Sequence, residues 1–113
     1  MKYLMIEDST DVILHLIPIL EIRGFEVYAK IDKLSIVCPW VSENRPEFIQ
    51  LDGLDGRCFE FYDVLASVSP ESNILIYSGD PDVEERARSE SRVFIPKFTS
   101  PDNLLEYIGG IRQ

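Results

Sequence analysis

Five short apolar runs alternate with longer segments of helical pattern along this chain, and this alternation constrains the fold more than any other feature. Strands that alternate with helices pair in parallel through right-handed crossovers, and the helices then cover both faces of the sheet. The sequence therefore predicts an α/β fold, a three-layer (βα)5 arrangement around a doubly wound parallel sheet of five strands. The predicted strands span residues 3–6, 25–31, 47–51, 73–77 and 93–95.

Capping and turn residues mark the ends of the helical segments. The first helix is predicted to begin at Ser9 or Thr10 and to end just before Gly24, since these residue types favour helix caps. The segment 32–44 predicts a weaker helix, because Pro39 interrupts it. The other predicted helices span residues 59–68, residues 81–90 and a last segment that follows Ser100 as its N-cap.

Size, charge and cysteine content limit the partners and the compartment. The 113 residues suit one domain, 1–113. A net charge of −9 repels nucleic acid phosphates and anionic membranes, so neither is an expected partner. Cys38 and Cys58 do not make a disulfide framework, and the apolar run at the N-terminus is too short for a signal peptide or a membrane span. We therefore expect a cytoplasmic protein.

Polar residues that can carry chemistry follow four of the five predicted strands. Glu7 and Asp8 follow the first strand, Asp52 comes directly after the third, Ser78 after the fourth and Lys97 after the fifth. Ligands of open parallel sheets bind outside the carboxyl ends of the strands, so we expect these side chains to gather there. Clustered carboxylates repel one another unless a cation joins them, and Mg²⁺ prefers oxygen ligands. Ser78 and Lys97 can neutralise a phosphoryl group that passes onto a carboxylate.

In their order, these motifs resemble the receiver domain of response regulators, of the chemotaxis-regulator type. The resemblance covers nearly the whole chain and rests on LMIEDS, PEFIQLDG, ILIYSGD and VFIPKF. It implies a flavodoxin-like fold with strand order 2-1-3-4-5. It also implies a role for each site residue: Asp52 as phosphoacceptor, Glu7, Asp8 and Asp52 as Mg²⁺ ligands, Ser78 and Lys97 as contacts of the phosphoryl group, and Ser78 with the aromatic Phe94 as the switch.

The sequence departs from the family pattern at two loops. The turn Asp55-Gly56 follows Asp52 almost at once, so the loop after the phosphoacceptor is about four residues shorter than usual. In the family a backbone carbonyl two residues past the phosphoacceptor binds the metal, and the matching residue is Leu54. The residue after the lysine is Phe98, where the family has a cis proline, so this loop is expected to run differently.

The resemblance implies a phosphoacceptor of a two-component signal transduction system rather than a turnover enzyme. A histidine kinase or phosphotransfer protein would phosphorylate Asp52, and a downstream protein partner would read the switched surface. Two alternatives remain: a pseudo-receiver that is never phosphorylated, which the shortened loop favours, and a small Mg²⁺-dependent phosphatase, for which no residue stands out as a general acid. A homodimer is also left open.

Overall fold

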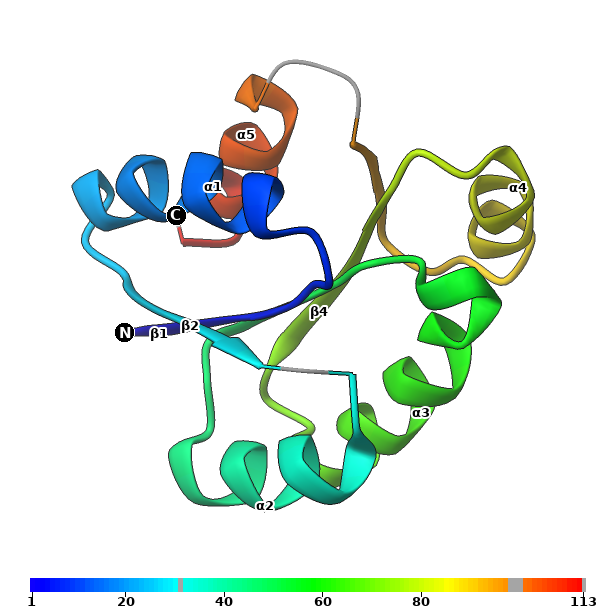
Figure 1. Cartoon of the computed structure of the whole chain (residues 1–113), viewed down its shortest axis with the longest axis horizontal. Helices are drawn as coiled ribbons and strands as arrows, with labels where there is room; N and C mark the ends of the chain where they lie inside the picture. The colour runs from blue at the N-terminus through cyan, green and yellow to red at the C-terminus, as the bar shows by residue number, and fades with distance from the viewer. Residues whose placement is uncertain (31, 98–100, 113) are drawn as a thin grey trace.

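The strands form one parallel sheet in a computed structural model, which describes residues 1–30, 32–97 and 101–112. The strands are β1 (Lys2–Ile6), β2 (Glu26–Lys30), β3 (Phe48–Leu51), β4 (Asn73–Ser78) and β5 (Phe94–Pro96). They lie in the order β2-β1-β3-β4-β5, and all neighbours pair in parallel (Figure 1). The predicted flavodoxin-like (βα)5 fold and its strand order 2-1-3-4-5 are confirmed.

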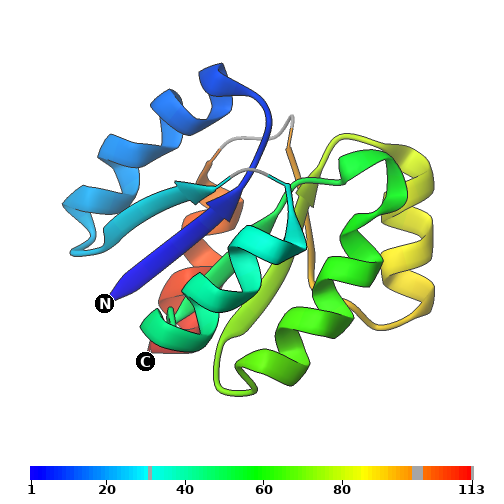
Figure 2. The ribbon, with the colours of Figure 1, turned by 60° about the horizontal axis from the view of Figure 1, so that its bottom comes forward.

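Helices lie on both faces of the sheet, so the three layers predicted from the alternation are present (Figure 2). In Figure 1, α1 and α5 lie on one side of the strands, and α2 and α3 lie on the other. A short 3-10 turn, η1 (Leu54–Gly56), precedes α3. The helices are α1 (Thr10–Ile22), α2 (Leu34–Asn44), α3 (Cys58–Val68), α4 (Pro81–Ser89) and α5 (Asp102–Arg112).

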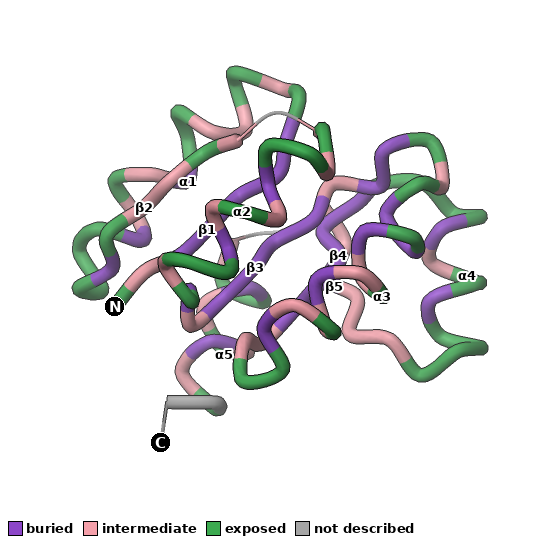
Figure 3. The backbone as a smooth tube through the Cα atoms, turned by 90° about the horizontal axis from the view of Figure 1, so that it is seen from below, coloured by how far each residue is buried: buried purple, intermediate pink, exposed green. Residues whose placement is uncertain are grey.

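The sheet divides the apolar core into two layers, because successive residues of a strand point to opposite faces. The layer beneath α1 and α5 contains Tyr3, Phe25 and Phe48, whose ring centroids lie 5.5 to 5.8 Å apart. The other layer packs against α2, α3 and α4 and includes Ile49 and Leu51 from the central strand β3. Figure 3 shows the buried central strands β1, β3 and β4 and the exposed outer sides of the helices. The central strands are therefore covered on both faces, and only their ends are open for chemistry.

Capping residues account for the start and end of α1. The Ser9 hydroxyl accepts the Val12 N–H at 3.4 Å, which confirms one of the two predicted caps. Gly24 has a φ of +93°, a left-handed conformation that glycine adopts without strain, and it lies just past the helix end. These caps direct β1 into α1, so Glu7 and Asp8 occupy the connection at the edge of the sheet.

The prediction that Pro39 interrupts the second helix is wrong. Helix α2 runs through this proline from Leu34 to Asn44. Proline at this position removes the bond that its N–H would donate to the Ser35 carbonyl, and its ring crowds that carbonyl. Both residues are exposed, so that carbonyl can bond water instead. The helix starts two residues later than predicted.

Some predicted features lie outside the described residues. These are the N-cap at Ser100, the backbone at Phe98, and residue 31 at the end of the second predicted strand. Within the part of the chain that the structure describes, no helix is both long enough and apolar enough to cross a membrane.

Candidate functional site

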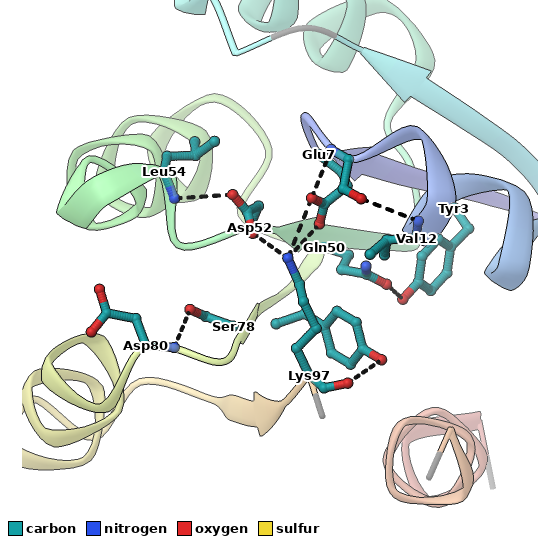
Figure 4. Close-up of polar contacts among 11 residues, drawn as sticks. Tyr3, Glu7, Val12, Gln50, Asp52, Leu54, Ser78, Asp80 and Lys97 are labelled. Atoms are coloured by element: carbon teal, nitrogen blue, oxygen red, sulfur yellow. Dashed lines mark hydrogen bonds and ion pairs between the residues drawn. The ribbon is translucent and has the colours of Figure 1, made fainter. Parts of the chain in front are cut away.

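The ends of β1, β3 and β5 bring Glu7, Asp52 and Lys97 into direct contact (Figure 4). Glu7 and Asp52 extend the register in which Ile6 of β1 pairs with Leu51 of β3, so they are neighbours on adjacent strands. Lys97 reaches them across β4. Its Nζ lies 3.0 Å from Glu7 Oε2 and also bonds Asp52 Oδ1. The structure thus brings together three of the five predicted residues, with the Lys97 ammonium between the carboxylates of Glu7 and Asp52.

Asp8 completes a cluster of three carboxylates. Glu7, Asp8 and Asp52 each offer an oxygen, and these oxygens lie within 4.8 Å of one another. Glu7 is buried, Asp52 is mostly buried and Asp8 is exposed, so the cluster opens to solvent on the Asp8 side. In the described part of the chain Glu7 Oε2 accepts no hydrogen bond of good geometry, although it faces Lys97. An all-oxygen set with an unsatisfied buried oxygen fits a hard divalent cation such as Mg²⁺.

Burial and the ion pairs shift the pKa values of the site in a consistent way. Burial raises the pKa of Glu7, and its hydrogen bonds with Lys97 and the Ser9 N–H only partly oppose this rise. Burial by itself would lower the pKa of Lys97, but its hydrogen bonds with Asp52 and Glu7 outweigh burial and raise it. Lys97 therefore remains an ammonium at neutral pH and is the fixed positive charge of the site.

The short loop after Asp52 orients the carboxylate through its backbone. The Leu54 N–H donates to Asp52 Oδ2 at 3.2 Å. Leu54 and Asp55 have φ angles of 50° and 54°, in the left-handed region that is uncommon for residues other than glycine. The Leu54 carbonyl accepts the Arg57 N–H at 3.0 Å. The role of the Leu54 carbonyl as a metal ligand stays a prediction, while the role of its N–H in holding Asp52 was not predicted.

Ser78 is buried at the end of β4, against the backbone of the loop that carries Asp52. Its hydroxyl oxygen accepts the Asp80 N–H at 3.1 Å. A Cβ added at Gly53 would come within 2.7 Å of this oxygen, so only glycine leaves room for the hydroxyl. No role for Gly53 was predicted from the sequence. A glycine directly after the candidate phosphoacceptor is the signal of close backbone approach that could have identified it.

Phe94 lies half-buried on β5, on the same face of the sheet as Ser78. Phe94 pairs with Ile76 on β4, and Ser78 is two residues further along that strand. The ring packs against the layer beneath α2, α3 and α4, and the Arg88 guanidinium of α4 lies 5.9 Å from its centroid. The predicted switch residues are thus near neighbours next to α4, although their role as a switch stays a prediction.

A buried hydrogen bond that was not predicted from the sequence lies directly beneath the site. The Tyr3 hydroxyl donates to Gln50 Oε1 at 2.5 Å, and both side chains are fully buried (Figure 4). Burial raises the pKa of Tyr3 well above its ordinary value, which keeps the hydroxyl protonated as a donor. Gln50 is two residues before Asp52 and points to the same face of β3. The polar glutamine within the apolar run FIQL is the sequence feature that could have indicated this buried hydrogen bond.

We expect Tyr3→Phe to lower the free energy of unfolding by about 1–3 kcal/mol, because it leaves the buried Gln50 oxygen without a donor. Urea denaturation measures this loss. Tyr28→Phe is the matched control, since the Tyr28 hydroxyl donates to Glu26 at an exposed position, where its loss should cost less than about 0.5 kcal/mol. Equal costs for the two variants would contradict a structural role for the Tyr3–Gln50 bond.

Comparison with solved structures identifies the fold. A response regulator from Desulfuromonas acetoxidans superposes with a TM-score of 0.77 at 14% identity, over 97% of this chain and 94% of the other. The BeF3-activated conformation of SdrG from Pseudomonas melonis Fr1 gives a TM-score of 0.75 at 16% identity, with the same coverage of 97% and 94%.

A third structure holds a modified aspartate. A response regulator protein from Burkholderia pseudomallei, with a phosphorylated aspartic acid, calcium ion and citrate, gives a TM-score of 0.76 at 21% identity. The match covers 92% of this chain and 64% of that protein, so this chain spans less than two thirds of its length. No protein-family model and no curated protein matches the sequence. The chain has the fold of response regulator receiver domains, which confirms at the level of the fold the resemblance seen in its motifs.

Proposed function

We propose that residues 1–113 form one phosphoacceptor receiver domain of a two-component signal transduction system, with Asp52 as the phosphoacceptor. The observation that carries this proposal is the Lys97 ammonium bonded to both Glu7 and Asp52 at the edge of the sheet, with Asp8 close by. A fold shared with response regulators supports it. In this proposal Asp52 is the nucleophilic carboxylate, and the groups around it balance the phosphoryl charge.

The chemistry assigns a task to each contact of Asp52. A carboxylate oxygen of Asp52 attacks the phosphorus of a phosphohistidine, a new O–P bond forms, the P–N bond breaks and the imidazole nitrogen keeps the electron pair. The Leu54 N–H holds one oxygen of Asp52, and the Lys97 ammonium is placed to donate to a phosphoryl oxygen. Mg²⁺ bound by Glu7, Asp8 and Asp52 would screen the charge of the phosphoryl oxygens.

The proposal includes the partners and the compartment. A histidine kinase or a phosphotransfer protein is the donor, a downstream protein is the reader, and the chain itself turns over no free substrate. The net charge of −9 argues against nucleic acid and membrane partners. Cys38 and Cys58 are both unpaired, which supports a cytoplasmic location.

A pseudo-receiver is the second candidate, and one observation favours it. Lys97 already pairs with two of the three carboxylates, and the Leu54 carbonyl already accepts a hydrogen bond from Arg57. A site in which the lysine and the carbonyl are already engaged in this way can serve as a structural element alone. The two candidates differ in whether Asp52 accepts a phosphoryl group.

We expect acetyl phosphate with Mg²⁺ to add one phosphoryl group to the chain, as measured by intact mass. Asp52→Asn should abolish the addition, because the amide is not a nucleophile of this kind. Asp55→Asn is the matched control: this exposed carboxylate lies three residues away, and asparagine tolerates its left-handed backbone. No mass increase in the native chain favours the pseudo-receiver, and an increase that survives Asp52→Asn shows that another residue is modified.

We also expect beryllofluoride with Mg²⁺ to change hydrogen exchange over residues 79–97. Helix α4 buries only Val83 and Ala87, and elements with few apolar contacts open at low cost. If Ser78 moves toward the phosphoryl oxygens, Phe94 on the same face can follow it. In Phe94→Ala, the change in hydrogen exchange should be confined to residues 52–60. Val93→Ala, on the opposite face of the sheet, should show the same change as the native chain. A change confined to residues 52–60 in the native chain would contradict this route.

A further inference from the structure

Two buried polar atoms beneath the sheet edge, one donor and one acceptor, have no hydrogen-bond partner within the described residues. The donor is the amide nitrogen of Gln50, a residue with 1% of its surface exposed. The acceptor is Glu7 Oε2, whose residue is 5% exposed. A buried amide without a partner is costly, and such groups in folded proteins call for a functional explanation.

The register of the sheet places these two side chains within reach of each other. Gln50 on β3 pairs with Met5 on β1, and Glu7 is two residues beyond Met5. Side chains two residues apart on a strand share a face, so Gln50 and Glu7 are diagonal neighbours. In Figure 4, Gln50 lies between Tyr3 and the Glu7–Lys97 pair, with its nitrogen turned away from the Tyr3 hydroxyl.

We propose that Gln50 is a positioning residue that holds the Glu7 carboxylate whenever Lys97 leaves it. In the present structure Lys97 is shared between Glu7 and Asp52. A phosphoryl group on Asp52 adds anionic oxygens that compete for the ammonium. As Lys97 moves toward them, the buried Glu7 carboxylate loses its cation, and the Gln50 amide is the donor able to replace it. Only the link to phosphorylation rests on the proposed function, since the Gln50 amide could replace the Lys97 ammonium at Glu7 whatever removes that ammonium.

The bond to Tyr3 shows which end of the Gln50 amide faces Glu7. The Tyr3 hydroxyl donates to Oε1 of Gln50, so the NH₂ group lies on the other side. The NH₂ group acts on Glu7, and it keeps this side without the Tyr3 hydroxyl, because the Glu7 carboxylate would repel the Gln50 oxygen. Two variants separate the role of the NH₂ group from that of the Tyr3 hydroxyl. Gln50→Met keeps the length of the side chain and removes the amide, whereas Tyr3→Phe disturbs the same buried pair and keeps the NH₂ group.

The first experiment measures stability in four chains by urea denaturation: native, Gln50→Met, Lys97→Met and the double variant. If Gln50 is the second partner of Glu7, Gln50→Met should weaken the folding equilibrium by about tenfold more in the Lys97→Met background than in the native chain, the factor expected for one hydrogen bond to a charged group. Tyr3→Phe should cost the same in both backgrounds. Additive effects of Gln50→Met and Lys97→Met would overturn the proposal.

The second experiment measures the affinity for beryllofluoride with Mg²⁺ by fluorescence or NMR titration. Gln50→Met should raise the Kd by about tenfold, and Tyr3→Phe should change it by less than about twofold. Equal losses in both variants would indicate a packing role and overturn the proposal. If the native chain binds no beryllofluoride but the stability effects are coupled, the proposed function fails while Gln50 stands as the partner of Glu7.

Discussion

Lys97→Met should lower the free energy of unfolding at neutral pH by about 3–5 kcal/mol, the usual cost of removing one partner from a buried ion pair. The lysine side chain is 14% exposed, and those of Glu7 and Asp52 are 1% and 14% exposed, so water screens these charges poorly. Without the ammonium, two adjacent carboxylates remain unpaired. Urea denaturation measures the loss, and Lys33→Met, at an exposed position, is the control that should cost less than about 0.5 kcal/mol.

The loss should depend on pH with a definite sign. Burial already raises the pKa of Glu7 above its ordinary value of 4.5, and the loss of Lys97 raises it further. A carboxyl group whose folded pKa is raised contributes full stability below the unfolded pKa and loses it as the pH rises through the folded pKa. The deficit of Lys97→Met should therefore be smallest below pH 4.5 and grow toward neutral pH. Mg²⁺ should restore part of it by supplying the missing charge, and a deficit independent of both pH and Mg²⁺ would contradict the ion-pair account.

Gly53→Ala should destabilise the fold by about 1–3 kcal/mol, the typical cost of forcing an extra methyl group into a packed site. The backbone of Gly53 has a φ of −61° and a ψ of −28°, which alanine adopts freely, so the cost comes from contact alone. The new methyl group would lie 2.7 Å from Ser78 Oγ and 3.3 Å from its Cβ. Thermal or urea denaturation measures the loss, and the rate of acetyl phosphate labelling should fall because Ser78 is displaced.

Two further variants test this explanation of Gly53. Ser78→Ala in the Gly53→Ala background should recover part of the lost stability, because it removes the nearest atom. Gly109→Ala is the matched control, because nothing lies within 4 Å of its added Cβ. This substitution within α5 should raise the free energy of unfolding by up to about 1 kcal/mol. If Gly53→Ala is neutral, or if Ser78→Ala recovers nothing, the close approach of the two residues is not the reason for glycine.

The parallel (βα)5 architecture could be predicted because it follows from rules that act on whole segments. Apolar runs that alternate with helical segments require parallel crossovers, and the strand ends then collect Glu7, Asp52 and Lys97 from distant parts of the sequence. The resemblance to receivers supplied the order 2-1-3-4-5. The prediction of an interruption at Pro39 was wrong because it considered only the local effect of proline on the helix backbone. The packing of Val37 and Val41 in the core keeps α2 continuous.

The details of the site could not be predicted, because they depend on where individual side chains point. The pattern did not indicate that Lys97 would bond both Glu7 and Asp52 while Asp8 faces solvent. Gly53 owes its role to the position of Ser78, which lies 25 residues further along the chain. Gln50 interrupts an apolar run, and only the register with β1 identifies the partners that it can reach.

The ion pair at the sheet edge also bears on how the protein is made. Lys97 lies 90 residues from Glu7 and 45 from Asp52 in sequence, so their contact closes long loops of the chain. During synthesis both carboxylates leave the ribosome long before the lysine does. A nascent chain therefore carries an acidic edge without its counter-charge until β5 is complete, and the contact forms after the local helices and the central strands. Asp52 is thus joined to its balancing charge only after β5 has taken its place in the sheet.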